Sequence, residues 1–306
     1  MKYLLASTAI VIATAGMASA EIALSGSARM GMVYSDDGTN SATQFSSRVR
    51  IVFTGSGETN TGLSFGASMR ADQDGGNGNG KENRDSTVYI SGAFGKLTMG
   101  DVSGAADALV GQVSGVGYGP NDALQEINFL GTVKTAVYYE YSTGALTFGV
   151  GTAQAKSTAE QKSIAVKYAT DMFSVALGYE TTNADFVFVP VAEDLISASA
   201  SVKLGDATVK ARVADTDVSG TDTAWAVSVD YSLGATTLTA FYTDYGNNTA
   251  RRNSGFRTGS TDTQHVGIGV AYDLGGGATF AGGIVQQNNT GVDDQTFADV
   301  GLKFSF

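Results

Sequence analysis

Cysteine is absent from the 306-residue chain, which also has only two prolines and one histidine. Without cysteine there is no disulfide framework, no thiolate metal site and no cysteine nucleophile. The single histidine, His265, leaves little room for histidine-rich metal ligation or for most acid–base catalysis. Basic residues are also few, since 19 Lys and Arg stand against 30 Asp and Glu, for a net charge of −11. This balance argues against nucleic-acid binding, which needs a basic footprint.

Long apolar runs are missing after the N-terminal region, so no transmembrane helix is expected beyond it. In that region Lys2 precedes the apolar stretch Leu4–Ala15 and the small residues Ala18-Ser19-Ala20. This order is typical of a secretory signal, and we expect residues 1–20 to be a signal peptide that is cleaved before Glu21. An uncleaved membrane anchor is the alternative, although the stretch is short for a span of ~20 residues.

Alternation of apolar and polar residues dominates the rest of the chain. Glycine is abundant at 40 residues, 42% of the residues are hydrophobic and only 16% are charged, so the mean hydropathy is near zero. Apolar residues occupy every second position in segments around 22–34, 49–53, 63–69, 164–168, 173–179, 196–202, 225–231, 266–272 and 300–306. Period two over about ten residues predicts a strand, and a tilted strand of that length crosses a bilayer.

The connections between these segments alternate in length. Seven are short, near residues 55–62, 95, 144, 171, 205, 234 and 275–277. Eight are long and polar, near residues 35–44, 72–85, 101–134, 154–161, 182–194, 215–223, 245–263 and 287–295. Fifteen connections separate sixteen strands, and short turns at one end with long loops at the other are typical of outer-membrane barrels. We therefore predict that residues 21–306 form one all-β domain, a sixteen-stranded antiparallel transmembrane β-barrel with short periplasmic turns and long outer loops.

A soluble β-sandwich is the alternative fold, because its strands alternate as well. In the segments above, the charged residues of the strands alternate with the apolar ones and so share the opposite face. A lipid-facing surface requires this, because placing Lys or Arg on it at the bilayer midplane costs ~2–4 kcal/mol. A sandwich core would exclude charge too. The number of long strands, the alternating connections and the export signal favour the barrel.

Several strand motifs carry a family resemblance: Ser25-Gly26-Ser27-Ala28-Arg29-Met30-Gly31, Ser46-Ser47-Arg48-Val49-Arg50-Ile51, Thr61-Gly62-Leu63-Ser64-Phe65-Gly66-Ala67, Ser91-Gly92-Ala93-Phe94-Gly95-Lys96, Ala271-Tyr272-Asp273-Leu274-Gly275-Gly276-Gly277 and Ala298-Asp299-Val300-Gly301-Leu302-Lys303-Phe304-Ser305-Phe306. They resemble the Gram-negative outer-membrane general porins, in particular those of purple photosynthetic bacteria. The resemblance implies a homotrimeric channel whose third long loop folds into the lumen. It also implies that no cofactor is required. Calcium is suggested by some relatives, but no ligand spacing fixes a metal site here.

Charged residues on the inward phase point to the pore chemistry. Four arginines share that phase on three consecutive strands: Arg29, Arg48, Arg50 and Arg70. The long segment 101–134 offers four acidic counter-charges: Asp101, Asp107, Asp122 and Glu126. If this segment folds inward, the acids face the arginines across the opening, and the transverse field favours small polar solutes. For any one of these acids, a solvated loop position away from the constriction is the alternative.

These observations predict an outer-membrane porin for passive diffusion of small hydrophilic solutes and ions, and not an enzyme. The alternatives are a barrel enzyme that uses His265 with a serine and an envelope β-protein without a channel. We expect His265 to line the channel mouth, because no Ser-His-acid spacing accompanies it.

The expected partners are outer-membrane lipid, lipopolysaccharide and two further copies of the chain. Small residues on strands near both chain ends allow close approach of backbones: Ala28, Ala67, Gly92, Ala93 and Ala298. The cluster Arg251, Arg252 and Arg257 in an outer loop is expected to be solvated, with lipopolysaccharide phosphates or a neighbouring subunit as the alternative contacts.

Overall fold

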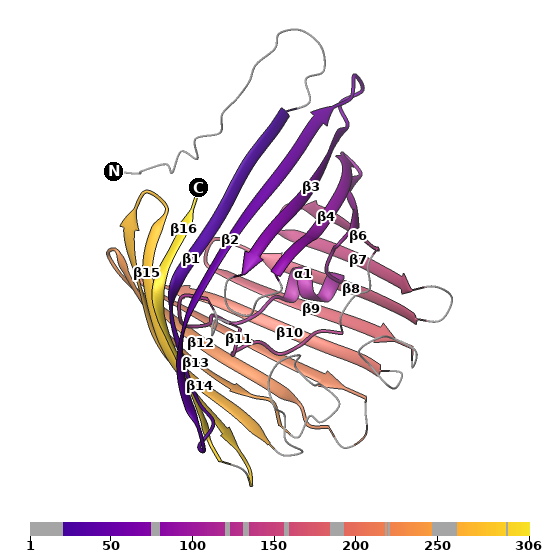
Figure 1. Cartoon of the computed structure of the whole chain (residues 1–306). Helices are drawn as coiled ribbons and strands as arrows, with labels where there is room; N and C mark the ends of the chain where they lie inside the picture. Colours follow the sequence, from indigo (N-terminus) through magenta and orange to yellow (C-terminus); the bar gives the residue numbers. More distant parts are fainter. Residues whose placement is uncertain are drawn as a thin grey trace.

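A closed barrel of antiparallel strands makes up nearly all of the structure, a computed structural model (Figure 1). It describes residues 21–74, 80–119, 123–130, 135–155, 159–183, 193–217, 219, 221–246, 262–291 and 293–306. Within these ranges the sixteen strands are β1 Glu21–Asp36, β2 Ser41–Glu58, β3 Ser64–Asp74, β4 Gly80–Gly92, β5 Gly95–Gly100, β6 Ala136–Thr143, β7 Leu146–Ala155, β8 Ala159–Ala169, β9 Phe173–Thr182, β10 Glu193–Leu204, β11 Ala207–Thr216, β12 Ala224–Leu233, β13 Thr236–Asp244, β14 Thr263–Gly275, β15 Ala278–Asn289 and β16 Gln295–Ser305. The predicted strand number and all-β class are confirmed.

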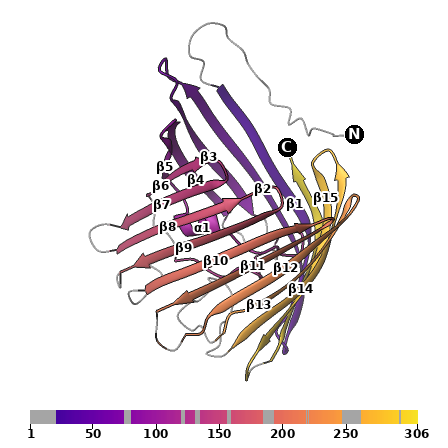
Figure 2. The ribbon, with the colours of Figure 1, turned by 180° about the vertical axis from the view of Figure 1, so that it is seen from behind.

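Every strand pairs with its neighbours in sequence, and β1 pairs with β16 to close the sheet. Because the pairing is antiparallel throughout, successive connections lie at opposite ends of the barrel, as Figures 1 and 2 show. A closed sheet leaves no unpaired edge, which is what a bilayer demands of a spanning β structure.

The outer surface of the barrel is apolar. Large hydrophobic side chains of the outward phase remain exposed, among them Ile22 at 73%, Leu24 at 62% and Ile268 at 60%. A soluble protein rarely leaves so much contiguous apolar surface in water. The sequence alternation is therefore read correctly, with the apolar phase facing lipid and the polar phase facing the lumen.

Several connections are shorter than the sequence predicts. The loop expected over residues 35–44 spans only 37–40, because β1 runs to Asp36 and β2 begins at Ser41. The loop expected over 72–85 shrinks in the same way, since β3 continues to Asp74 and β4 begins at Gly80. Above the membrane band both phases of a strand are polar, so alternation disappears from the sequence while backbone pairing continues.

Three sequence predictions concern residues outside the described ranges and stay predictions. They are the signal peptide at 1–20, the constriction acid Asp122 and the basic cluster Arg251, Arg252 and Arg257. Across the part of the chain that the structure describes, no helix has the length and apolarity to cross a membrane.

Candidate pore constriction

The segment between β5 and β6, residues 101–135, is called the inward loop here. Its described residues, 101–119, 123–130 and 135, run inside the barrel along its inner wall (Figure 1). Its helix α1 (Ala105–Val110) lies within the ring of strands in both ribbon views (Figures 1 and 2). The backbone N–H of Ala105 donates to Ser163 Oγ on β8 at 2.7 Å. At the other end of α1, Ser199 Oγ on β10 donates to the carbonyl of Val110, also at 2.7 Å. These contacts fix α1 against the inner faces of β8 and β10.

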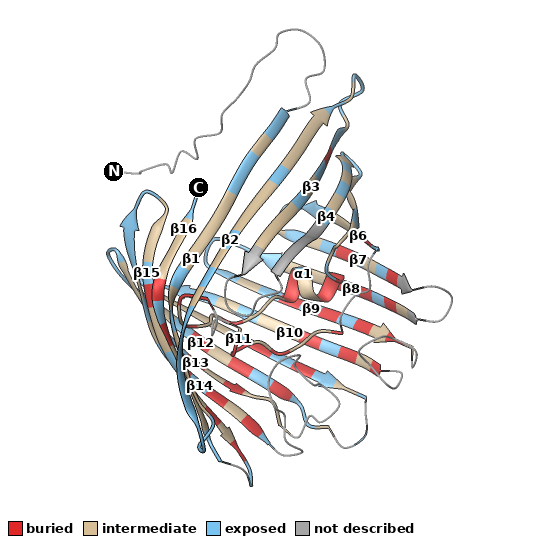
Figure 3. Cartoon of the chain, viewed as in Figure 1, coloured by how far each residue is buried: buried red, intermediate tan, exposed pale blue. Residues whose placement is uncertain are grey.

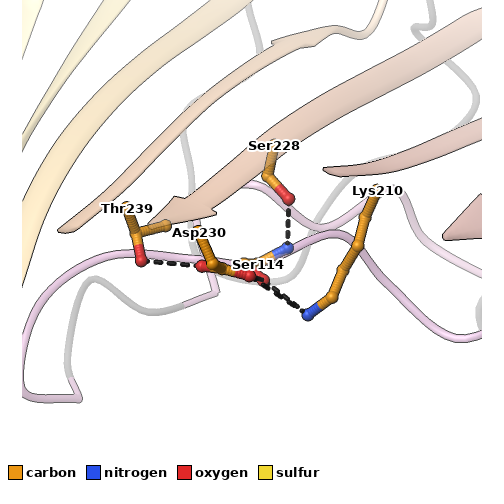
Figure 4. A network of polar contacts seen from close by, with 5 residues as sticks. All are labelled: Ser114, Lys210, Ser228, Asp230 and Thr239. Carbon is orange, nitrogen blue, oxygen red and sulfur yellow. Dashed lines mark hydrogen bonds and ion pairs between the residues drawn. The ribbon is translucent and has the colours of Figure 1, made fainter. Parts of the chain in front are cut away.

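Beyond α1, the inward loop is held at Ser114 by a polar network on β11, β12 and β13 (Figure 4). The Ser114 N–H donates to Ser228 Oγ at 2.9 Å, and its hydroxyl donates to Asp230 Oδ2 at 2.5 Å. Lys210 Nζ donates to the same hydroxyl at 2.6 Å and lies 3.5 Å from Asp230 Oδ2. Thr239 Oγ1 donates to Asp230 Oδ1 at 2.8 Å. Charge-assisted hydrogen bonds of this kind are stronger than neutral ones.

The tip of the inward loop reaches the seam between β16 and β1. The N–H of Tyr118 donates to Asp299 Oδ1 on β16 at 3.1 Å. Glycines flank the tyrosine: a Cβ on Gly117 would overlap the Asp299 carboxylate, and one on Gly119 would overlap the guanidinium of Arg29. Gly117 also has φ +99°, a backbone conformation that favours glycine. Only glycine therefore allows this close approach to the wall.

The inward loop then returns along the same wall. The Leu124 carbonyl accepts hydrogen bonds from Tyr245 Oη at 2.7 Å and from His265 Nδ1 at 2.5 Å, and Arg212 Nη1 donates to the Ile127 carbonyl at 2.6 Å. Burial raises the pKa of the Tyr245 hydroxyl far above its ordinary value, so Tyr245 stays a donor. His265 faces inward as predicted, but it is only 4% exposed and lies under the returning segment rather than lining an open mouth.

The inward loop thus covers one side of the lumen and leaves the other side open. Covered inward-phase charges include Glu180, Arg212 and Asp299, which are 0%, 3% and 6% exposed. In Figure 3 the buried positions gather on α1 and on the strands from β6 to β16. By contrast, no residue of β1 or β2 is buried. The free lumen therefore lies toward β2 and β3, which carry Arg48, Arg50 and Arg70, while Arg29 on β1 lies against the loop tip at Gly119.

Arg29, Arg48, Arg50 and Arg70 form what we call the arginine wall. Their partial exposure and the alternation of the strands place them on the lumen side, opposite the outward Met30, Val49 and Met69. Arg29 of β1 and Arg48 of β2 are direct partners in the strand register. The structure thus brings the four together on one patch of the inner wall.

A fifth wall residue, Asp72, was missed by the sequence analysis. Arg50 Nε lies 2.9 Å from Asp72 Oδ1, and Arg50 Nη2 lies 3.3 Å from Oδ2. Arg70 Nη2 lies 2.9 Å from the same Oδ2. The available signal was spacing, because Asp72 follows Arg70 by two residues and so shares its strand face. From the sequence, Asp72 falls in the long outer loop expected over residues 72–85.

The structure describes three of the four acids that were predicted to face the arginines. Asp101 begins the inward loop and donates its N–H to the Ser86 carbonyl at 2.9 Å. Asp107 is half-buried in α1, and Glu126 is half-buried on the returning segment. Asp122 lies outside the described residues. Their position opposite the arginine wall stays a prediction.

Metal ligation was left open by the sequence. Within the described ranges, no three histidine or acidic side chains come together as a group that could hold a metal ion.

Comparison with known proteins agrees with this architecture. Residues 6–292 match the family model for Gram-negative porins. The chain is 33% identical to a porin of Rhodobacter capsulatus and 28% identical to a porin of Fuscovulum blasticum, each alignment covering 94% of this chain and all of the relative. A solved porin structure refined at 1.8 Å superimposes with a TM-score of 0.73 at 31% identity, over 94% of this chain and all of that chain. A triple mutant of the Rhodopseudomonas blastica porin, 24% identical over 93% of this chain and all of its own, has a TM-score of 0.73 and shows the same fold. The chain belongs to the Gram-negative porin family and forms a channel of the outer membrane.

Proposed function

We propose that small hydrophilic solutes and ions pass through a constriction between the arginine wall and the inward loop. The observation that carries this proposal is the path of the loop, which follows the inner wall from β8 to β16 and leaves β2, with Arg48 and Arg50, without a buried residue. Cations on one side and the loop acids Asp101, Asp107, Asp122 and Glu126 on the other would set up a transverse field. Such a field orders water and favours small polar solutes over apolar ones.

Channel activity is tested by adding the purified protein to a planar lipid bilayer. We expect the current to rise in equal steps as single channels insert. Hydrolysis of ester substrates without stepwise currents would instead indicate a barrel enzyme. If the protein gives neither stepwise currents nor ester hydrolysis, it is an envelope protein without a channel.

We propose that the protein is a homotrimer that packs through the outward faces near its chain ends. A shallow apolar depression supports this surface: it spans β1, β2, β15 and β16 and is lined by Met30, Met32, Phe45, Phe280 and Leu302. The small residues Ala28 and Ala298 lie on the same strands and let backbones approach closely.

Native mass measurement in mild detergent is expected to give three chains. Ala28→Trp should weaken the trimer by placing a bulky ring in the interface. Ala200→Trp, on the outward phase of β10 away from the chain ends, should not weaken it. Monomers alone in the unmodified protein would contradict the assembly, and equal loss of trimer in both variants would contradict the proposed surface.

A further inference from the structure

One carboxylate bridges two guanidinium groups in the arginine wall. Asp72 receives Arg50 through both oxygens, at 2.9 and 3.3 Å, and Arg70 through one oxygen at 2.9 Å. The Arg50 contact is two-pronged, a geometry that fixes the plane of the guanidinium as well as its distance. Asp72 therefore limits where both arginines can reach.

The three side chains remain in contact with the lumen. Their exposed fractions are 16% for Asp72, 27% for Arg50 and 22% for Arg70. A half-buried pair that faces the lumen contributes only modestly to stability, because lumen water still screens it. Its charge nevertheless acts on ions that pass within a Debye length of ~8–10 Å. The cluster is thus better placed to select ions than to hold the fold.

The strand register puts Asp72 at the edge of the cationic patch. Arg29 of β1 lies opposite Arg48 of β2, and the next inward position of β2, Arg50, lies opposite Asp72 of β3. Of the four arginines, Asp72 thus contacts Arg50 on β2 and Arg70 on β3. In the same register, Asp74 of β3 is the partner of Arg48, and Arg84 of β4 is the partner of Arg70.

We propose that Asp72 is a specificity-determining residue of the channel, which lowers its preference for small anions by neutralising and restraining Arg50 and Arg70. This inference rests on the proposed function, since it requires that the arginine wall lines the constriction. Asp72 acts in two ways at once. Its negative charge offsets that of the arginines, and its hydrogen bonds hold two guanidinium groups along the wall instead of in the path of the solute.

The test is the reversal potential in a planar bilayer under a potassium chloride gradient. Asp72→Asn has nearly the same shape but no charge, and we expect it to raise the anion-to-cation permeability ratio about twofold, as expected for one charge several ångströms from the passing ion. Asp171→Asn, in the short turn between β8 and β9, makes the same change in net charge and should leave the ratio unchanged. Asp72→Glu, which keeps the charge, should stay close to the unmodified protein.

A double variant that removes one charge of each sign separates the effect of charge from the effect of a folding defect. Arg50→Gln alone should shift the ratio toward cations, and Asp72→Asn with Arg50→Gln should return it close to the starting value. An unchanged ratio in Asp72→Asn, while Arg48→Gln with Arg50→Gln shifts it, would overturn the role of Asp72 and leave the proposed constriction standing. If neither change shifts the ratio, the arginine wall does not line the constriction and both proposals are wrong.

Discussion

Replacing Arg48 and Arg50 together by glutamine is expected to shift the reversal potential toward cations by a few-fold in permeability ratio. Both side chains lie on the lumen side of β2, in the part of the wall that the inward loop leaves open. Charges that face a narrow aqueous lumen act within a Debye length of ~8–10 Å, where ordinary salt screens them little. The chain as a whole carries a net charge of −11, so losing two arginines adds to its excess of acidic charge.

Two companion variants separate the constriction from the rest of the surface. Asp122→Asn with Glu126→Gln should shift the reversal potential the other way, toward anions, if these acids face the arginines. Arg251→Gln with Arg252→Gln should change it little, because we expect the outer loop that the sequence predicts for these arginines to lie more than a Debye length from the constriction. No shift in the Arg48 and Arg50 variant would mean that these side chains face lipid, which requires a strand register displaced by one residue.

Replacing Gly117 by valine is expected to lower single-channel conductance and to destabilise the protein by about 2–5 kcal/mol. The new Cβ would overlap the Asp299 carboxylate on β16, and the φ of +99° strains any residue that has a side chain. The Asp299 carboxylate and the tip of the inward loop cannot both keep their positions, and we expect the tip to move away from the wall and into the lumen. The direction of the conductance change follows from this geometry.

Gly111→Val is the matched control for Gly117→Val. Gly111 also has a positive φ, +67°, but a Cβ at this position meets no atom within 4 Å. It should therefore lose some stability through backbone strain while its conductance stays near that of the unmodified protein. Equal conductance in the two variants would show that the contact of Gly117 with the wall does not set the width of the lumen.

The barrel itself could be predicted from the sequence because a single physical constraint shapes every strand. Lipid on one face and water on the other force a period of two, and turn residues such as Gly144, Gly205 and Gly234 mark the short connections. The four arginines could be assigned to the lumen for the same reason. This constraint ends at the membrane boundary, where both faces of a strand meet water.

The parts that could not be predicted lie outside that constraint. Asp72 was placed in a loop because the residues around it are polar on both faces, and only the pairing of β3 with β2 and β4 keeps it in a strand. The path of the inward loop depends on contacts between residues far apart in sequence, such as Ser114 with Lys210 and Asp230. No local pattern encodes such contacts, so the structure was needed to find them.

The seam between β1 and β16 has a consequence for how the protein assembles. Its partners are almost a whole chain apart: Ser27 pairs with Ser305, and the N–H and carbonyl of Gly26 each bond to Phe306, at 2.7 and 3.0 Å. Contacts of such sequence separation form slowly, because their loop-closure entropy is lost before they add stability. Until β16 docks, two strands expose unpaired edges, which are templates for aggregation. The chain must therefore reach the membrane before these open edges aggregate. An assembly factor would bind the edge of β1 or β16 until the two strands pair.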